Sequence, residues 1–310
     1  MSLRVIFLGT GGSVPTSSRG LPAVLIVRKG EQIMFDCGEG VQRQMVKAGG
    51  GFHRKMKIFI THMHGDHVLG LPGLMQTMAL LGRERKLDVY GPPGITEFME
   101  CIKETVQFAL TFQVEIHELE EEGIVCEETE YFVQAAYANH VIKGFAYALV
   151  EKPRPGKFYP EKAKALGIAE GPLWSRLQQG HEVKLKGGRI VKPSEVVGKP
   201  REARKIVYTG DTRPFKNLKK LAAGASLLIH EATFDDSLKD RAAEDGHSTP
   251  SQAARDAKSA KVERLILTHI SARYEDASKL ARLVKQAKKI FENTQAAEDF
   301  MKLEIPLCDD

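Results

Sequence analysis

The sequence contains little cysteine and has no long apolar run. Its 310 residues include four cysteines, far apart and without a CxxC pair, which excludes a disulfide-built scaffold and a zinc ribbon. No apolar stretch approaches the ~18 residues that a membrane-spanning helix needs, and the N-terminus lacks the layout of a signal peptide. We therefore expect a cytoplasmic protein with reduced thiols and no membrane association.

Charge is distributed unevenly along the chain. Residues 151–205 contain 14 Lys and Arg against 6 Asp and Glu, a net charge of +8, whereas the whole chain carries +5. The remainder is therefore at −3, and residues 115–130 hold eight Glu without any Lys or Arg. One basic segment on an otherwise acidic chain indicates either a locally docked polyanionic partner or a solvated helical arm.

Strand-like and helix-like segments alternate along the chain, which predicts an α/β fold. Residues 151–201 differ, because six prolines interrupt a stretch rich in glycine and lysine. This segment predicts an inserted arm with short helices at 161–166 and 172–178. Elsewhere the apolar patterns predict strands at 3–8, 23–28, 31–35, 57–61, 87–90, 205–209, 226–230 and 263–268, and helices at 68–81, 95–107, 250–259 and 276–291.

Four side chains that bind metals well lie within six residues, directly after the apolar segment 57–60. They are His62, His64, Asp66 and His67. Imidazole nitrogen and carboxylate oxygen are ligands that suit Zn²⁺ and related divalent ions. A loop at a strand end can turn the first two residues to one side and the last two to the other, which predicts two adjacent metal ions.

Three further candidates follow later strand-like runs. His140, Asp211 and His269 each come at or just after the end of such a run. Any one of them could be an ordinary polar residue at a strand end. Together with the first cluster, their placement predicts one shared site at an edge of a sheet.

These motifs resemble those of the metallo-β-lactamase superfamily and, within it, the short form of the ribonuclease Z family of tRNA 3′-processing endoribonucleases. The resemblance implies a four-layer αββα sandwich, a single domain over residues 1–310, with a protruding basic arm inserted at about 151–190. The matching segments are 8–19, 35–44, 61–67, the His140 region, 209–214, 230–234, 246–249 and 267–274.

The resemblance also implies the ligands of two ions, with a carboxylate bridging them. The two triads are His62, His64 and His140, then Asp66, His67 and His269, and the bridge is Asp211. Two Zn²⁺ per subunit are expected, with Mn²⁺ or Fe²⁺ as alternatives. The water that they activate would attack the phosphodiester of precursor tRNA, with Asp66 also accepting its proton. The expected products are a tRNA with a 3′-OH and a 3′ trailer with a 5′-phosphate.

A leaving 3′ oxygen needs a proton, and His247 in the segment 246–249 is the expected general acid. Glu231 is expected to orient it, since a carboxylate fixes the tautomer of a histidine and raises its basicity. The alternatives are a residue beside a helix start for His247 and a buried salt bridge for Glu231. His230 is expected to pack beside the site.

The glycine-rich segment 9–13 lacks the GK[ST] of a P-loop and the full GxGxxG of a dinucleotide fold, so no nucleotide cofactor is expected. It predicts a turn that lets the backbone approach the site. Asp36 is a candidate outer partner for a ligand histidine, and Cys37 beside it is not expected to bind metal.

Contacts with tRNA are expected at the arm, where phosphate contacts position the RNA without reading bases. The candidates are Arg154, Lys157, Gly171 and Pro172, with Arg273 near the scissile phosphate or in a structural ion pair. The resemblance also implies a homodimer, and the Met-rich segment 68–81 would be a core helix or part of that interface.

Two other functions compete with this one. A hydrolase of a small phosphodiester, lactone or thioester on the same fold would explain the ligands but not the basic insertion. A non-catalytic RNA-binding protein on the same scaffold would not need all seven ligand positions, which are intact.

Overall fold

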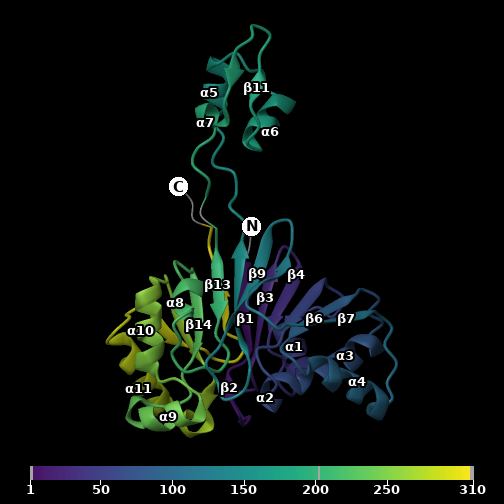
Figure 1. Cartoon of the computed structure of the whole chain (residues 1–310), viewed down its shortest axis with the longest axis vertical. Helices are drawn as coiled ribbons and strands as arrows, with labels where there is room; N and C mark the ends of the chain where they lie inside the picture. The colour runs from purple at the N-terminus through teal and green to yellow at the C-terminus, as the bar shows by residue number, and fades with distance from the viewer. Residues whose placement is uncertain (1–2, 202, 308–310) are drawn as a thin grey trace. The chain divides into compact units, whose positions relative to one another are not determined.

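The computed structural model describes residues 3–201 and 203–307. The chain divides into two compact units, the first formed by residues 3–150 and 205–306 and the second by residues 151–201, 203–204 and 307. Figure 1 shows both units with their helices and strands. In the described part of the chain, no helix has both the length and the apolar character needed to cross a membrane.

Two sheets form the centre of the first unit, each with seven strands among the described residues. The first sheet has the order β18-β1-β3-β4-β5-β6-β7, with β1 Leu3–Gly9, β3 Ala23–Arg28, β4 Glu31–Phe35, β5 Met56–Phe59, β6 Leu87–Gly91, β7 Val114–Glu118 and β18 Lys302–Glu304. The second has the order β17-β15-β14-β13-β10-β9-β8, with β8 Gly123–Glu127, β9 Tyr131–Tyr137, β10 Phe145–Glu151, β13 Lys205–Tyr208, β14 Leu227–Glu231, β15 Leu265–Thr268 and β17 Thr294–Ala296. Strand β2 (Gly11–Gly12) pairs with β16 (Ile270–Ser271).

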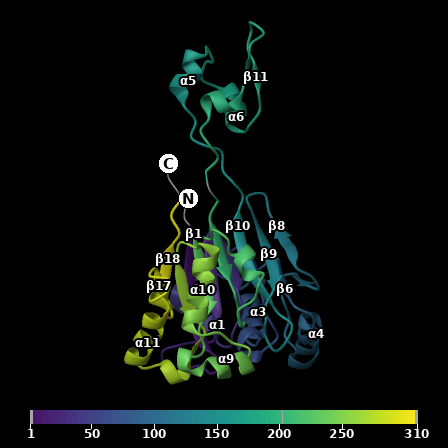
Figure 2. The same ribbon diagram turned by 60° about the vertical axis from the view of Figure 1, so that its left-hand side comes forward.

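Helices cover the outer face of each sheet (Figures 1 and 2). The first sheet packs against α1 Val41–Ala48, α3 Gly70–Leu80 and α4 Ile95–Val106, and the second against α8 Leu218–Leu221, α10 Pro250–Ala260 and α11 Ala277–Lys288. The remaining helices of this unit are α2 Gly65–Val68, η1 Asp236–Leu238, α9 Lys239–Asp245 and η2 Ala272–Tyr274. The order of layers is helix, sheet, sheet, helix, which confirms the predicted αββα sandwich.

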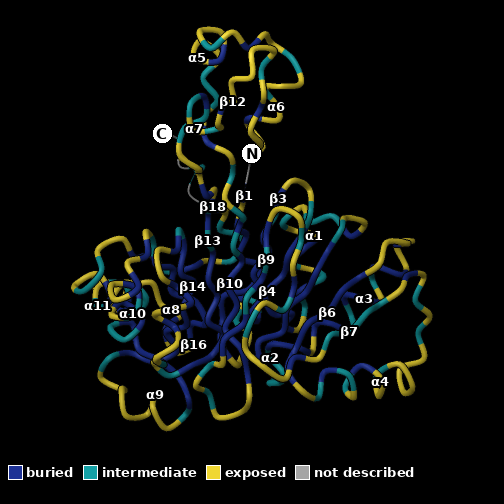
Figure 3. The backbone as a smooth tube through the Cα atoms, turned by 45° about the horizontal axis from the view of Figure 1, so that its top comes forward, coloured by how far each residue is buried: buried dark blue, intermediate teal, exposed yellow. Residues whose placement is uncertain are grey.

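The interior between the sheets is apolar and aromatic. Figure 3 shows in dark blue that much of the two sheets is buried. Phe35 of the first sheet stacks on Tyr147 and Tyr208 of the second, with ring centroids 5.9 and 5.7 Å apart. Alternation along each strand sends every second side chain into this interior and the others toward the helices. The central strands β5, β14 and β15 are therefore buried on both faces, and the short apolar runs of the sequence reflect this.

Parallel pairing explains why distant polar residues meet. Strands β4, β5 and β6 are parallel, and so are β13, β14 and β15. The carboxyl ends of parallel strands lie at the same edge of a sheet, so the loops that follow them converge. Strand β10 is antiparallel to β13, which brings the loop before β10 to the same edge.

The second unit has its own small core. It contains α5 Pro160–Ala165, α6 Pro172–Gln178, β11 Val183–Lys184, β12 Ile190–Val191 and α7 Pro193–Val196. Both predicted short helices are present, and both begin with proline, which is favourable at the first position of a helix. The arm expected at about 151–190 lies within this unit, which continues through β12 and α7 to Arg204.

Candidate metal centre

Three histidines of the first predicted triad converge at the edge of the sandwich. Nε2 of His62 lies 3.0 Å from Nδ1 of His64, and Nε2 of His140 lies 3.3 Å from the same atom. Oδ2 of Asp211 is 3.8 Å from Nε2 of His62. The four ligand atoms lie within 4.8 Å of one another, a spacing that a single divalent ion can close.

The second triad lies on the other side of Asp211. Oδ2 of Asp66 is 3.5 Å from Nε2 of His67 and 3.3 Å from Nε2 of His269. The carboxylate of Asp211 approaches both rings, with Oδ2 3.4 Å from His67 and Oδ1 3.3 Å from His269. It therefore faces both triads, as a bridging ligand must.

The outward nitrogens of the ligand histidines are held by hydrogen bonds. Nδ1 of His67 donates to Oδ2 of Asp36 over 2.7 Å, and Nδ1 of His140 donates to the backbone carbonyl of Gly246 over 2.8 Å. Because these acceptors require the proton on Nδ1, each Nε2 presents a lone pair to the centre. Asp36 is thus hydrogen-bonded to a histidine of the predicted ligand set, where an outer partner is expected.

Two threonine hydroxyls hold two more ligand rings. Oγ1 of Thr61 donates to Asp36 and lies 3.0 Å from Nδ1 of His62, and Oγ1 of Thr233 lies 2.8 Å from Nδ1 of His269. Since each hydroxyl proton is directed to a carboxylate, the hydroxyl oxygen accepts from the ring. Both rings then turn their Nε2 lone pairs inward.

Two buried polar atoms at the centre have no hydrogen-bond partner among the described residues. They are Nε2 of His67 and Oδ1 of Asp211. A buried polar atom is costly unless it is paired. A divalent cation would satisfy both atoms, so the donor set fits a metal ion and the site is a candidate divalent-metal centre.

The charges of the centre shift its pKa values in opposite directions. Burial, reinforced by the neighbouring His67, lowers the pKa of His62 well below its usual value. Burial also opposes a charge on His67, but the carboxylates of Asp211 and Asp36 outweigh it and raise its pKa. For Asp66, burial raises the pKa, but the hydrogen bond and charge of His269 outweigh it and lower the pKa overall.

The glycine-rich turn after β1 approaches the centre closely. A Cβ at Gly12 would lie 2.5 Å from the ring of His269, so no side chain fits there. The next residue, Ser13, donates its backbone N–H to Oδ2 of Asp66 over 2.8 Å. His269 itself has a left-handed backbone with φ of 55°. The predicted role of this segment, a turn that lets backbone reach the site, is confirmed.

A buried carboxylate–histidine pair lies beside the ligands. Oε1 of Glu231 is 3.0 Å from Nδ1 of His247, and it also accepts from the backbone N–H groups of Thr212 and Ser248. Oε2 accepts from the backbone and hydroxyl of Thr233. Burial lowers the pKa of His247, but the Glu231 carboxylate outweighs burial and raises it to about 9.

Arg273 reaches this pair through an aromatic ring. Its guanidinium lies 5.1 Å from the ring centroid of Phe234, and that ring lies 5.8 Å from His247. A guanidinium over an aromatic face is held electrostatically while its edge stays open to an anion.

The structure thus gathers all seven predicted ligands, together with Glu231 and His247, in one place. Arg154, Lys157, Gly171 and Pro172 belong to the second unit. Sequence reasoning missed the two hydroxyls of Thr61 and Thr233 and the phenol of Tyr208, which donates to Asp36 over 2.8 Å. Both threonines adjoin motif residues, which was the available signal, whereas Tyr208 lies inside an apolar strand and gave none.

The chain is similar to proteins of the metallo-β-lactamase class. Residues 182–270 match the family described as Beta-lactamase superfamily domain, and residues 3–152 match the family described as Anti-Pycsar protein Apyc1. The chain is also similar to the metallo-β-lactamase fold protein YhfI of Bacillus subtilis, at 17% identity and a TM-score of 0.69, over 98% of this chain and 99% of that one. The predicted metallo-β-lactamase fold is therefore confirmed.

Two relatives show to which family within this class the chain belongs. The ribonuclease Z of Methanosarcina acetivorans is 48% identical over 304 residues, which are 98% of this chain and 98% of that protein. The crystal structure of human tRNase Z, short form, is similar with a TM-score of 0.73 and 32% identity, over 98% of this chain and 100% of that chain. The chain belongs to the ribonuclease Z family, as its motifs indicated.

Proposed function

We propose that this protein is a metal-dependent endoribonuclease that removes the 3′ trailer from precursor tRNA. The products are a tRNA with a 3′-OH and a trailer with a 5′-phosphate. The observation that carries the proposal is the double His/Asp site around Asp211 with the His247–Glu231 pair beside it, in a chain of the ribonuclease Z family.

The proposed cofactor is a pair of Zn²⁺ ions in each subunit. His62, His64 and His140 would hold one ion, and Asp66, His67 and His269 the other, with Asp211 shared. This mixture of imidazole nitrogen and carboxylate oxygen suits Zn²⁺, and it also accepts Mn²⁺ or Fe²⁺. When bound, the ions would lower the pKa of a water and neutralise charge that develops on the phosphoryl oxygens.

Asp66 is the proposed acceptor of the proton from the attacking water. The backbone N–H of Ser13 holds its Oδ2 in place, so this carboxylate has a defined orientation at the second triad. A carboxylate with a lowered pKa stays ionised at neutral pH and can take up a proton transiently.

His247 is the proposed donor of a proton to the leaving 3′ oxygen. Its Nδ1 is engaged by Glu231, which leaves Nε2 to face the substrate. Because the pKa of His247 is raised to about 9, the ring carries a proton at neutral pH. Arg273, stacked on Phe234, would bind a phosphate oxygen near the same bond.

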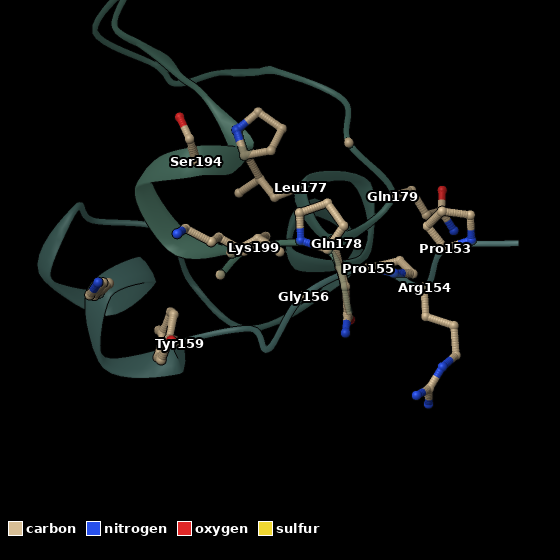
Figure 4. Close-up of a pocket in the computed structure, with 16 residues that line it drawn as sticks. Pro153, Arg154, Pro155, Gly156, Tyr159, Leu177, Gln178, Gln179, Ser194 and Lys199 are labelled. Atoms are coloured by element: carbon tan, nitrogen blue, oxygen red, sulfur yellow. The ribbon is translucent and has the colours of Figure 1, made fainter. Parts of the chain in front are cut away.

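The second unit is proposed to bind the body of the tRNA. It contains a pocket of about 750 Å³, drawn in Figure 4, whose lining includes Arg154, Lys162 and Lys199 beside several prolines. The backbones of Arg154 and Arg201 pair in an isolated antiparallel bridge. Nη2 of Arg154 and Nε of Arg201 are buried without hydrogen-bond partners among the described residues. Cationic groups of this kind suit phosphate oxygens, and Lys157, Gly171 and Pro172 would extend the surface.

A homodimer is proposed through helices α1 and α3. Helix α3 buries Leu74 and Met78 in the core, as expected for a core helix, but leaves Leu80 83% exposed. Val46 on α1, which packs beside α3, is 64% exposed. Val46 and Leu80 are the exposed apolar side chains that the proposed interface would cover. The cytoplasm is the proposed location, since the described cysteines Cys37, Cys101 and Cys126 are free thiols.

The test is cleavage of a precursor tRNA that carries a 3′ trailer, with and without Zn²⁺ or Mn²⁺. The wild-type chain is compared with Asp66→Ala, and the cut end is mapped. One metal-dependent cut after the acceptor stem, leaving a 3′-OH and reduced at least about 10⁴-fold in the variant, would support the proposal.

The opposite result would identify a different substrate class. If no metal restores cleavage of the RNA while a small phosphodiester or thioester is hydrolysed, the fold remains and the proposed substrate is wrong. Sedimentation of the wild-type chain, alongside Leu80→Asp, tests the proposed dimer, because a charge at that position should dissociate it.

A further inference from the structure

His230 is a buried residue to which the proposed mechanism gives no role. It precedes Glu231 on β14 and is fully buried. Consecutive side chains of a strand point to opposite faces, so His230 lies toward helix α10 while Glu231 faces His247. Figure 1 shows α10 beside β14, and Figure 2 gives a second view of the same helix.

Both ring nitrogens of His230 face acceptors. Nδ1 lies 2.8 Å from the backbone carbonyl of Glu231, which can only accept, and Nε2 lies 3.5 Å from Oδ2 of Asp256 on α10. Neither Nε2 nor Oδ2 makes a hydrogen bond with a described residue, and the two atoms face each other at ion-pair distance. The ring of His230 is fully buried and the side chain of Asp256 is 21% exposed, so the ion pair is shielded from solvent on the histidine side. Burial lowers the pKa of His230, but Asp256 outweighs burial and raises it.

The rest of the α10 face that is buried consists of small residues. The residues that pack it on the sheet are Ala253, Ala254, Ala257 and Ala260, together with Pro250. Alanine allows close approach but offers little interlocking of side chains along the helix axis. The pair of His230 and Asp256 is a directional contact between α10 and β14, and it acts together with the hydrogen bonds that Ser251 at the start of α10 donates to Asp236.

The position of α10 in turn sets the position of His247. The helix begins after Thr249, whose side chain and backbone form a capping box with Gln252. His247 comes two residues before this cap, and the intervening Ser248 donates its backbone N–H to Oε1 of Glu231. The loop of residues 246–249 is thus fixed at one end by the helix and at its middle by Glu231.

We propose that His230 and Asp256 are positioning residues, an ion pair that fixes α10 on β14 and thereby holds His247 against Glu231. Two neighbouring residues of β14 then make histidine–carboxylate pairs with consecutive parts of the chain. Glu231 pairs with His247 in the loop before α10, and His230 pairs with Asp256 on α10 itself. This inference rests on the proposed role of His247 as proton donor.

The test is a double-mutant cycle on cleavage of precursor tRNA. Asp256→Ala should lower kcat about tenfold with KM unchanged, because a small displacement of His247 misplaces the donated proton. In the background of His247→Ala the same change should cost less than about twofold, since the group being positioned is gone. Asp256→Asn, which keeps an oxygen acceptor, should retain part of the rate.

Ala257→Gly is the matched control, because it weakens the same helix without touching the pair. An equal loss for Asp256→Ala in both backgrounds, or an equal loss from Ala257→Gly, would overturn the inference and leave a merely structural role.

Hydrogen exchange provides a readout that is independent of activity. In Asp256→Ala the amides of residues 246–249 should exchange about tenfold faster than in the wild type and than in Ala257→Gly. If the wild-type chain does not cleave precursor tRNA, the proposed function fails while this measurement still decides whether the pair holds the loop. Unchanged exchange in that segment would refute the inference.

Discussion

The two compact units differ in how much apolar core supports them. Three large clusters of buried residues support the sandwich, whereas the second unit has one cluster of six, Ala163, Ile168, Leu177, Val183, Val191 and Val196. A reaction that depends on sub-ångström placement needs the first kind of support. Binding a polyanion requires mainly positive charges at roughly the spacing of its phosphates, so a small and cationic unit is sufficient.

The same contrast holds for the polar groups. Around the metal centre almost every side chain is oriented by a second one, as Asp36 orients His67 and Glu231 orients His247. In the second unit, cationic side chains such as Lys157 and Lys199 are exposed. Changes in the sandwich should therefore act on the chemical step, and changes in the second unit on binding.

Among the variants that compare the two units, the largest effect is expected from His247→Ala. Loss of the proton donor should lower kcat by about 10²–10⁴-fold, with the affinity for precursor tRNA unchanged. Single-turnover cleavage and a filter-binding assay measure the two quantities. His181→Ala in the second unit is the matched change and should leave kcat intact. If His247→Ala weakens the affinity for precursor tRNA and leaves kcat normal, the proposed difference between the two units is wrong.

Glu231→Gln should change the pH dependence. The donor must be protonated, so the rate falls as pH rises through the pKa of His247. Glu231 raises that pKa, and removing its charge should move the high-pH limb of kcat to lower pH. Glu170→Gln, an exposed change in the second unit, is the control. If the high-pH limb of kcat does not move, Glu231 does not set the pKa of His247.

Arg154→Gln combined with Lys157→Gln should act on binding alone. We expect affinity for precursor tRNA to weaken roughly tenfold and the salt dependence of log Kd to lose about one unit of slope for each lost phosphate contact. The value of kcat should be unchanged. Lys219→Gln with Lys220→Gln, on α8 of the sandwich, is the comparison pair. Equal salt slopes for both double variants would argue against a tRNA-binding role.

The smallest effect on catalysis is expected from Leu177→Ala. This residue is fully buried in the core of the second unit, and its truncation should cost that unit about 2–5 kcal/mol of stability. Proteolysis within residues 151–204 should accelerate, while the main thermal transition of the sandwich and hydrolysis of a small phosphodiester stay unchanged. Leu74→Ala in the sandwich should instead lower the main transition. A single shared transition would show that the units do not unfold separately.

The strands and the ligands could be predicted because one pattern encodes both. The apolar run within the predicted strand 263–268 forms β15 at Leu265–Thr268, and the polar residue that follows, His269, lies at the sheet edge. The apolar pattern extends this strand to Thr61, yet β5 ends at Phe59, and the backbone N–H and hydroxyl of Thr61 donate to Asp36 instead. That competition between a strand and a distant carboxylate is not visible in the local sequence.

Helix α1 was not predicted, and its sequence shows why. Residues 41–48 bury only Val41 and Met45, so the apolar stripe is too narrow to give a clear period. The helix is instead set by two left-handed glycines, Gly40 before it and Gly49 after it. The contact between Tyr208 and Asp36 was equally hidden, because it joins residues 172 positions apart that belong to different sheets.

That contact gives Asp36 an unusual place in the sandwich. Its carboxylate accepts from Thr61 and His67 of the first half and from Tyr208 of the second. The preceding residue, Phe35, stacks on Tyr208 in the interior. The spacing of the two sheets is therefore transmitted directly to a ligand ring. A substitution in the interior that shifts one sheet against the other should therefore change the orientation of His67 as well as the stability of the fold.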